Sequence, residues 1–214
     1  MENYKQKFIS LSLEIGALKF GEFQLKSGRI SPYFFNMGLF SSGPLIKNIG
    51  DFYAAALVSS NINYDIVFGP AYKGIPIVTA LASSLSTSYQ LDKPFVYNRK
   101  EVKNHGEGGV TVGEELRGNV VIVDDVITAG TAIREAVDII NNAGATTTGI
   151  VISLDRQERG VGDLSAAKEI SNTLNIPVIS IVNLDEVIDY IDNNPSDYGQ
   201  HIDKIKKYRE EYGA

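Results

Sequence analysis

The chain has 214 residues, of which 43% are hydrophobic and 21% are charged, and these proportions are typical of a soluble globular protein. Its length suits one large α/β domain, and no apolar run approaches the roughly 18 residues that suggest a membrane span. The absence of cysteine excludes disulfides and cysteine-ligated zinc, and the net charge of −6 argues against a general nucleic-acid-binding surface.

The first 40 residues are expected to form a helix and a hairpin, with no apolar core of signal-peptide type. Apolar residues recur at helical spacing from Phe8 to Leu18, which predicts an amphipathic helix over residues 3–17. Two short extended runs flank Ser27-Gly28, a pattern typical of a hairpin. The apolar positions between Leu45 and Leu57 predict a second helix.

From residue 64 onward, apolar strands alternate with helices. Strands are predicted at 64–69, 94–98, 119–125, 148–155 and 177–182, and helices at 74–88, 131–142 and 163–174. Strands that are continuously apolar and separated by helices indicate a mainly parallel sheet covered on both faces. The segments LDEVIDYIDNN and HIDKIKKYREEY predict two further helices. We therefore expect residues 1–214 to form one doubly wound α/β domain with an N-terminal hairpin-and-helix hood.

Residues 99–118 interrupt this alternation and are expected to form a long loop. They contain five glycines and little apolar periodicity, and Arg99, Lys100, Lys103 and His105 concentrate positive charge in an acidic chain. Such a segment is either a solvated charge run or a functional loop, and its glycines favour one that folds over a ligand. The other histidine, His201, is expected to be structural or solvated, so a multi-histidine metal site is not expected.

Four segments are expected to leave the carboxyl ends of the parallel strands, where ligands bind in such sheets. They are GPAYKG (69–74), the 99–118 loop, DDVITAGT (124–131) and DRQERG (155–160). All four are rich in glycine or in charged residues, so their convergence predicts a binding site.

The segment VVIVDDVITAGTA places two acids before a loop of small residues. A loop that enters a helix near Thr131 suits a phosphate, although it could also be an ordinary turn capped by threonine. Asp124 and Asp125 could accept hydrogen bonds from sugar hydroxyls and hold Mg²⁺ through water, or they could cap a turn and face solvent. A nucleotide triphosphatase would require the pattern G-x-x-x-x-G-K-[ST], which the sequence lacks.

VVIVDDVITAGTA resembles the ribose-phosphate signature of the type I phosphoribosyltransferases. KSGRISPYFFN, GPAYKG, NRKEVKNHGEGG and ISLDRQERG extend the resemblance over essentially the whole chain and make it similar to the orotate phosphoribosyltransferases. The resemblance implies transfer of the 5-phosphoribosyl group from 5-phosphoribosyl 1-pyrophosphate to orotate with Mg²⁺, giving orotidine 5′-monophosphate and pyrophosphate in pyrimidine (UMP) biosynthesis. A phosphoribosyltransferase for another base and a non-catalytic sugar-phosphate sensor remain alternatives.

The resemblance also implies roles for individual residues. Asp124 and Asp125 would hold the ribose hydroxyls. The residues that would cradle the 5′-phosphate are Val126, Ile127, Thr128, Ala129, Gly130, Thr131 and Ala132. Tyr72 and Lys73 would bind the leaving pyrophosphate, with a cis peptide expected at Ala71–Tyr72.

The remaining implied roles concern the lid and the base. Residues 99–118 would form a mobile lid that reaches into the neighbouring subunit of a homodimer, with cations at Arg99, Lys100, Lys103 and His105. Lys26 would contact the substrate near the base. Phe34, Phe35, Thr128 and Arg156 would bind orotate, although the two phenylalanines could equally be core residues. We expect the protein to be cytoplasmic, to bind no nucleic acid or membrane, and to hold Mg²⁺ mainly through its substrates.

Overall fold

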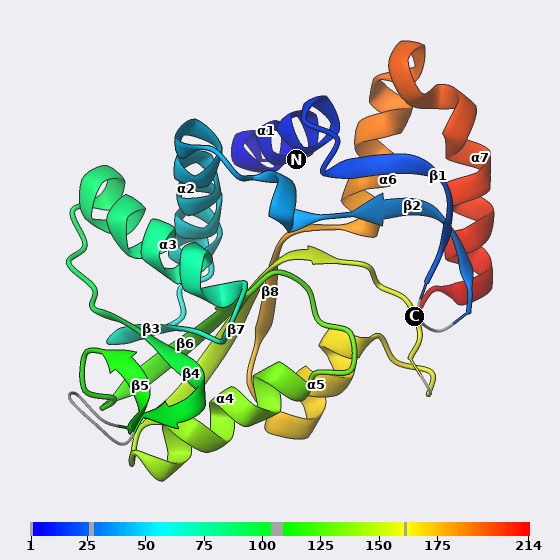
Figure 1. The fold of residues 1–214 in the computed structure, drawn as a ribbon. Helices are drawn as coiled ribbons and strands as arrows, with labels where there is room; N and C mark the ends of the chain where they lie inside the picture. Colours follow the sequence, from blue (N-terminus) through cyan, green and yellow to red (C-terminus); the bar gives the residue numbers. More distant parts are fainter. Residues whose placement is uncertain (1, 26–27, 104–108, 161) are drawn as a thin grey trace.

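A computed structural model describes residues 2–25, 28–103, 109–160 and 162–214, and its centre is one six-stranded sheet (Figure 1). The strands are β3 (Ile66–Gly69), β4 (Phe95–Lys103), β5 (Gly109–Gly113), β6 (Asn119–Asp124), β7 (Thr146–Asp155) and β8 (Val178–Asn183). They lie in the order β5-β4-β3-β6-β7-β8, and every neighbouring pair is parallel except β4 with β5. The predicted doubly wound, mainly parallel sheet is confirmed.

Helices cover both faces of this sheet. The helices on the two faces are α2 (Gly43–Ser59) and α3 (Gly74–Tyr89) on one side, and α4 (Thr131–Asn142) and α5 (Ala166–Leu174) on the other (Figure 1). Alternate residues of β6 enter two separate cores: Val121 and Val123 pack towards the first side, and Val120 and Ile122 towards the second. This burial on both faces explains why the strand sequences are apolar without alternation.

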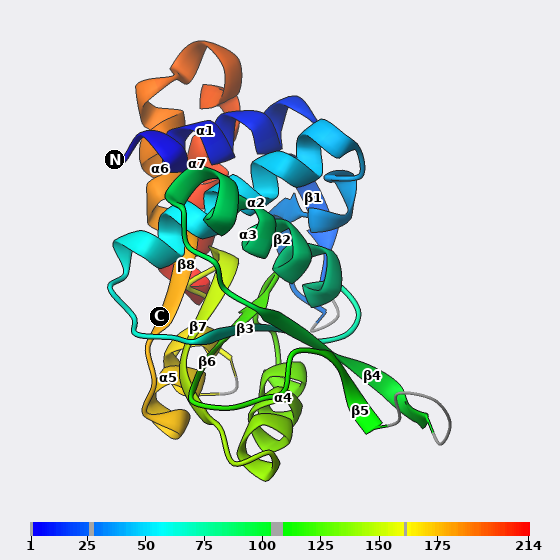
Figure 2. The ribbon, with the colours of Figure 1, turned by 90° about the vertical axis from the view of Figure 1, so that its left-hand side faces the viewer.

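A smaller layer, here called the hood, lies over the end of the sheet. It contains α1 (Asn3–Glu14), the antiparallel strands β1 (Leu18–Gln24) and β2 (Ile30–Phe35), and the C-terminal helices α6 (Leu184–Asn193) and α7 (Pro195–Tyr212). A single 3₁₀ turn, Met37–Leu39, joins the hood to α2. Figures 1 and 2 show α6 and α7 beside the hairpin, so segments from the two ends of the chain build this layer together. The first helix is shorter than the predicted 3–17 because Gly16 turns the chain with a φ of 70°.

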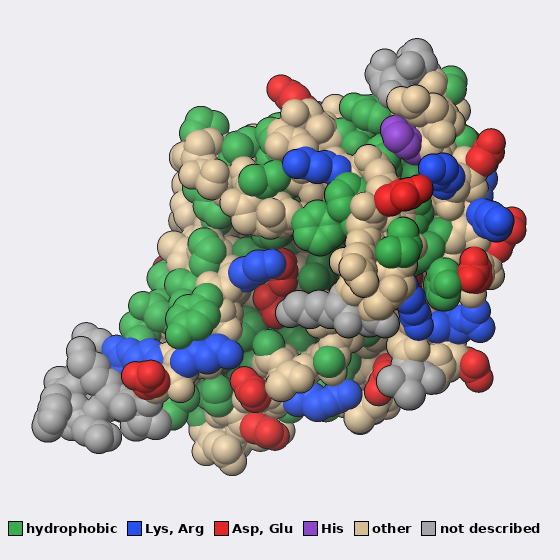
Figure 3. Space-filling view, turned by 45° about the vertical axis from the view of Figure 1, so that its right-hand side comes forward, with side chains coloured by type: hydrophobic (Ala, Val, Ile, Leu, Met, Phe, Trp, Pro, Cys, Tyr) green, Lys and Arg blue, Asp and Glu red, His purple; other side chains and the backbone are tan. Residues whose placement is uncertain are grey.

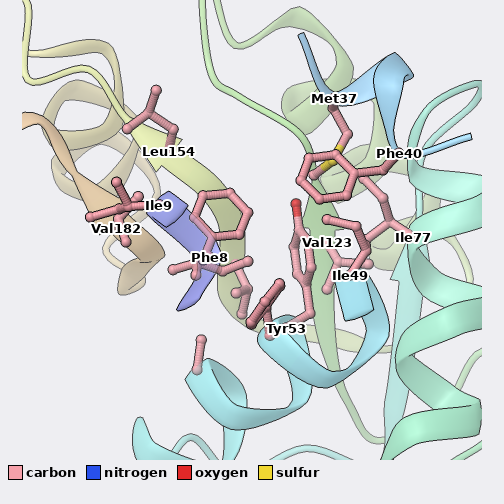
Figure 4. Close-up of a cluster of buried hydrophobic side chains, with 14 of the residues drawn as sticks. Phe8, Ile9, Met37, Phe40, Ile49, Tyr53, Ile77, Val123, Leu154 and Val182 are labelled. Atoms are coloured by element: carbon pink, nitrogen blue, oxygen red, sulfur yellow. The ribbon is translucent and has the colours of Figure 1, made fainter. Parts of the chain in front are cut away.

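The interface between hood and sheet is apolar. Figure 4 shows Phe8 of α1 near Tyr53 of α2, with Phe40, Ile49 and Val123 in the same cluster. All five side chains are buried. This continuous packing fixes the hood relative to the carboxyl ends of the strands.

The segment 99–118 contains more regular structure than the predicted loop. Residues up to Lys103 continue β4, and Gly109–Gly113 form β5, which pairs antiparallel with β4. The charged end of β4 and the glycine-flanked β5 satisfy their backbone groups by pairing with each other, a contribution that apolar periodicity does not report. Figure 2 shows these two strands extending away from the body of the sheet. Among the described residues, no helix is long and apolar enough to cross a membrane.

Candidate active site

The loop between β3 and α3 runs from Pro70 to Lys73 and is unusually tight. The Ala71–Tyr72 peptide is cis, as predicted. A Cβ on Gly69 would lie 2.2 Å from the carbonyl oxygen of Gly74, a separation that excludes any side chain there. The sequence G-P-A-Y-K-G therefore forms a turn in which the backbones of Gly69 and Gly74 approach too closely for a side chain on Gly69.

Asn98 at the neighbouring strand β4 fixes this loop. Its Oδ1 accepts a hydrogen bond of 2.8 Å from the backbone N–H of Ala71, and the side chain is buried. Tyr72 is 70% exposed, and Nζ of Lys100 lies 5.9 Å from the centroid of its ring. Residues of β4 thus contact this loop at two points, through the Asn98 hydrogen bond and through Lys100 beside the exposed Tyr72 ring.

Lys73 joins this loop to the two aspartates after β6. Its exposed Nζ forms an ion pair with Oδ2 of Asp125, whose side chain is largely buried. Figure 3 shows basic and acidic side chains together in a hollow of this face. The structure therefore brings the predicted pyrophosphate loop and the predicted ribose carboxylates into contact.

The backbone of the two aspartates is fixed by neighbours in the core. The Tyr53 hydroxyl donates to the carbonyl of Asp124 at 2.7 Å, and the Ser153 hydroxyl and N–H both donate to the carbonyl of Asp125, at 2.5 and 2.9 Å. The N–H of Asp125 donates to Oδ1 of Asp124 at 2.9 Å. These bonds place both carboxylates at the end of the strand.

Burial and like charge perturb Asp124. Desolvation of its carboxyl, together with the nearby charge of Asp125, raises its pKa from 3.8 to about 7. The backbone hydrogen bond and the charge of Lys73 act in the opposite direction but are outweighed. A carboxyl with such a pKa favours a ligand that donates hydrogen bonds or carries positive charge.

The loop from Val126 to Gly130 leads into α4, as predicted. It lines a hollow of about 270 Å³ together with Lys100, Asp124 and the first turn of α4. The side chains of Thr128, Ala129 and Thr131 are exposed, whereas that of Ile127 is buried in the core. The first N–H groups of a helix have no intrahelical acceptor, so this hollow suits an anion such as phosphate.

Gly130 shapes the entry to that helix. It adopts a φ of 72°, and a Cβ at this position would lie 2.6 Å from Cδ1 of Ile170. Both conditions favour glycine, so the small residue before Thr131 has a conformational as well as a steric cause. The Ala132 side chain is half-buried in the first turn.

Of the residues predicted to bind the base, Phe34 and Phe35 lie on β2, Arg156 follows β7, and Thr128 lies in the loop after β6. Phe34 is 42% exposed and stacks on Phe23, whereas Phe35 packs against Phe8 in the core. The two neighbouring phenylalanines therefore point to opposite faces of β2, and Phe34 is the more exposed of the two. The Phe35 side chain is half-buried and packs against the core, which agrees with the alternative of a core residue.

Arg156 lies beneath the hood and is largely buried. It contacts Ser31, Tyr33 and Glu158, and its Nη2 is 2.6 Å from Oε1 of Glu158. No sequence pattern indicated this internal partner. Glu158 was visible only as one charge within DRQERG.

Several predicted residues have less structural definition. Lys26 and His105 lie outside the described residues. Lys103 is described only as the last residue of β4, and Arg99 is half-buried on the same strand. His201 lies in α7 with its ring 5.5 Å from that of Phe20, consistent with the structural role expected for it.

Three supporting residues were not predicted: Asn98, Tyr53 and Ser153. Asn98 ends the predicted apolar strand 94–98 with a polar side chain, which is a usable signal. The other two look like ordinary members of a helix and a strand, and their partners are distant in sequence. Within the described ranges, no three histidine, cysteine, aspartate or glutamate side chains are grouped to hold a metal ion.

Comparison with known proteins places this site in context. A family model of the phosphoribosyl transferase domain matches residues 40–185. Over 214 residues the chain is 53% identical to orotate phosphoribosyltransferase of Mannheimia succiniciproducens and 54% identical to that of Marinobacter nauticus, covering 100% of each chain. The crystal structure of orotate phosphoribosyltransferase from Francisella tularensis is 44% identical, with a TM-score of 0.88 over 97% of this chain and 100% of that one. The similarity therefore includes the hood as well as the matched domain.

Proposed function

The chain belongs to the orotate phosphoribosyltransferase family, and we propose that it transfers the 5-phosphoribosyl group of 5-phosphoribosyl 1-pyrophosphate to orotate. The products are orotidine 5′-monophosphate and pyrophosphate, as in pyrimidine (UMP) biosynthesis. The observation that carries the proposal is the full-length identity of 53–54% to proteins of this name. The contact of Lys73 with Asp125 beside the hollow at α4 supports it, since one sugar donor would meet all three features.

Different parts of the 5-phosphoribosyl 1-pyrophosphate molecule would bind to these different features. Its 5′-phosphate suits the hollow lined by residues 126–132, and its ribose hydroxyls suit the carboxylates of Asp124 and Asp125. Its pyrophosphate would meet Tyr72 and Lys73, so the Lys73 ammonium would exchange Asp125 for the leaving group. Arg99, Lys100, Lys103, His105 and Lys26 are proposed as further contacts to the donor.

The base would enter between the hood and the sheet. The side chain of Arg156 is a planar cation suited to the carboxylate of orotate, and Phe34 and Thr128 offer an exposed ring and a hydroxyl. Phe35 would contribute through its backbone, because its side chain belongs to the core.

The reaction is a displacement at ribose C1. The bond from C1 to the pyrophosphate oxygen breaks, and a bond from C1 to a ring nitrogen of orotate forms. Positive charge developing on the ribose would be stabilised by Asp124 and Asp125, and negative charge on the pyrophosphate by Lys73 and Lys100. Holding the two substrates together supplies the rest of the catalysis, and no covalent enzyme intermediate is required.

The carboxylates of this site would suit a Mg²⁺ ion that is bound together with the substrate phosphates. It prefers oxygen ligands and is commonly held by one or two carboxylates together with substrate phosphates. Asp124 and Asp125 are adjacent, and the described residues provide no third carboxylate grouped with them. Bound there, Mg²⁺ would neutralise charge on the departing pyrophosphate.

We further propose that residues 99–118 act as a lid shared across a homodimer in the cytoplasm. The extension of β4 and β5 away from the sheet supports a segment that reaches beyond its own subunit (Figure 2). Mixed dimers of Lys103→Ala subunits and Asp125→Asn subunits should recover activity that neither parent has. Confirmed heterodimers without such recovery would contradict a lid that acts in the neighbouring site.

The proposed reaction is tested by measuring pyrophosphate release with orotate, uracil, hypoxanthine and adenine as acceptors. We expect release with orotate and Mg²⁺, little with the other bases, and loss of activity with excess EDTA. Release with a purine instead would identify a transferase for another base. Donor binding without release from any acceptor would favour a sugar-phosphate sensor.

A further inference from the structure

We propose that Glu158 is a positioning residue that holds the Arg156 guanidinium ready for the carboxylate of the incoming base. The inference rests on the proposed function, because it takes Arg156 to be the group that meets orotate. It adds a role for a residue two positions further along the same loop.

Glu158 makes two short hydrogen bonds through a single oxygen. Its Oε1 accepts from Nη2 of Arg156 and from the hydroxyl of Tyr33, both at 2.6 Å. The Glu158 and Arg156 side chains are only 11% and 17% exposed. Charge-assisted bonds in such a sheltered place restrict both side chains more than a surface ion pair would.

The guanidinium is held on two further sides. Nη2 of Arg156 also donates to Oγ of Ser31 at 3.2 Å, and its Cζ lies 4.3 Å from the centroid of the Tyr33 ring. Nη2 carries two N–H groups, so these two acceptors use both of them. In the described part of the chain, Arg156 donates no hydrogen bond through Nε or Nη1, and these donors remain for a ligand.

The loop that carries both residues is anchored independently of this pair. The N–H of Arg159 donates to the carbonyl of Tyr212 at 2.8 Å, and Glu158 forms a β-bridge with Gly213. On the hood side, Nη1 of Arg29 donates to the carbonyl of Arg159 at 2.9 Å. Because the backbone is held by these contacts, loss of the Glu158 carboxylate should free the Arg156 side chain without releasing the loop.

A positioning role differs from a purely structural one in what it affects. An arginine that is already ordered avoids the entropy cost of immobilising a long side chain when the base binds. That saving applies only to binding of the base. A structural ion pair would instead contribute to the stability of the whole domain, and its loss would lower that stability without raising the KM for orotate in particular.

The test is a double-mutant cycle on Arg156→Ala and Glu158→Ala, with kcat and KM measured for orotate and for the sugar donor. We expect Glu158→Ala to raise the KM for orotate about three- to tenfold, with the donor KM and kcat within about twofold of the wild type. In the Arg156→Ala background, Glu158→Ala should cause no further rise. Asp192→Ala, which removes a remote and more exposed ion pair with Lys206, is the matched control and should leave all values unchanged.

The outcomes separate the two proposals. Unchanged orotate KM in Arg156→Ala would overturn the proposed base contact. A raised KM in that variant, with an additive effect of Glu158→Ala, would overturn the positioning role alone. If Glu158→Ala fails to fold, Glu158→Gln and Tyr33→Phe replace it, and each should give a smaller rise that also vanishes without Arg156.

Discussion

Replacing Gly130 by alanine tests whether the entry to α4 is built as described. At a φ of 72° an alanine side chain costs about 1–2 kcal/mol more than glycine. The new Cβ would also lie 2.6 Å from Cδ1 of Ile170. Because that atom is the end of a flexible side chain, the overlap should add about 1–2 kcal/mol, which is near the lower end of overpacking costs.

Gly144→Ala provides the matched control. Gly144 has a φ of 78°, and a Cβ added there would meet no atom within 4 Å. It should therefore show the backbone cost alone, about 1–2 kcal/mol. The difference between the two variants isolates the contact with Ile170 in α5.

The assay is urea denaturation of both variants and the wild type, with the donor KM measured in parallel. Gly130→Ala should lose about 2–4 kcal/mol in total, equivalent to roughly 4–16 °C in Tm for a chain of this size. Its donor KM should rise, because the loop that receives the phosphate must shift, while Gly144→Ala keeps the wild-type value. Equal stability and equal donor KM in the two variants would refute the tight approach of Gly130 to α5.

Three further predictions concern other parts of the site. Asn98→Ala removes the acceptor for the Ala71 N–H and should raise the donor KM with a stability loss of about 1–3 kcal/mol by urea denaturation, and an unchanged donor KM would count against a role of Asn98 in holding the loop. Because the pKa of Asp124 is raised from 3.8 to about 7, the folded state binds a proton more tightly than the unfolded state. The stability of the wild type relative to Asp124→Asn should therefore fall as pH rises from about 4 to 7 and then level off. Urea denaturation that shows no such slope would contradict the burial of this carboxyl. Lys103→Ala should lower turnover far more than it weakens donor binding by calorimetry, and unchanged turnover would count against a catalytic lid.

The order of elements could be predicted because the central strands β3, β6 and β7 are largely buried on both faces. Runs such as that from Val120 to Val123 are apolar throughout, and the intervening helices show clear periodicity. The pairing of β4 with β5 could not be predicted in this way, because an extended hairpin of charged and glycine residues buries little apolar surface. Its stability comes from backbone hydrogen bonds, which leave no mark on hydrophobic spacing.

In the candidate site, too, residue types could be predicted from the sequence, whereas contacts between distant residues could not. Asp124 and Asp125 were predicted because carboxylates suit sugar hydroxyls and their loop follows a parallel strand, whereas the role of Lys73 was implied by the family resemblance of GPAYKG. Their contact with each other, and the shifted pKa of Asp124, follow from tertiary packing. The Tyr53 hydroxyl donates to the carbonyl of Asp124, which lies 71 positions further along the chain, and a single sequence does not reveal this contact.

The most direct test of the proposed function is identification of the product formed from orotate, 5-phosphoribosyl 1-pyrophosphate and Mg²⁺ by the purified protein. Orotidine 5′-monophosphate and pyrophosphate should appear in equal amounts, and Lys73→Ala should sharply reduce both. Folded wild-type protein that binds the donor but forms no orotidine 5′-monophosphate would contradict the proposal.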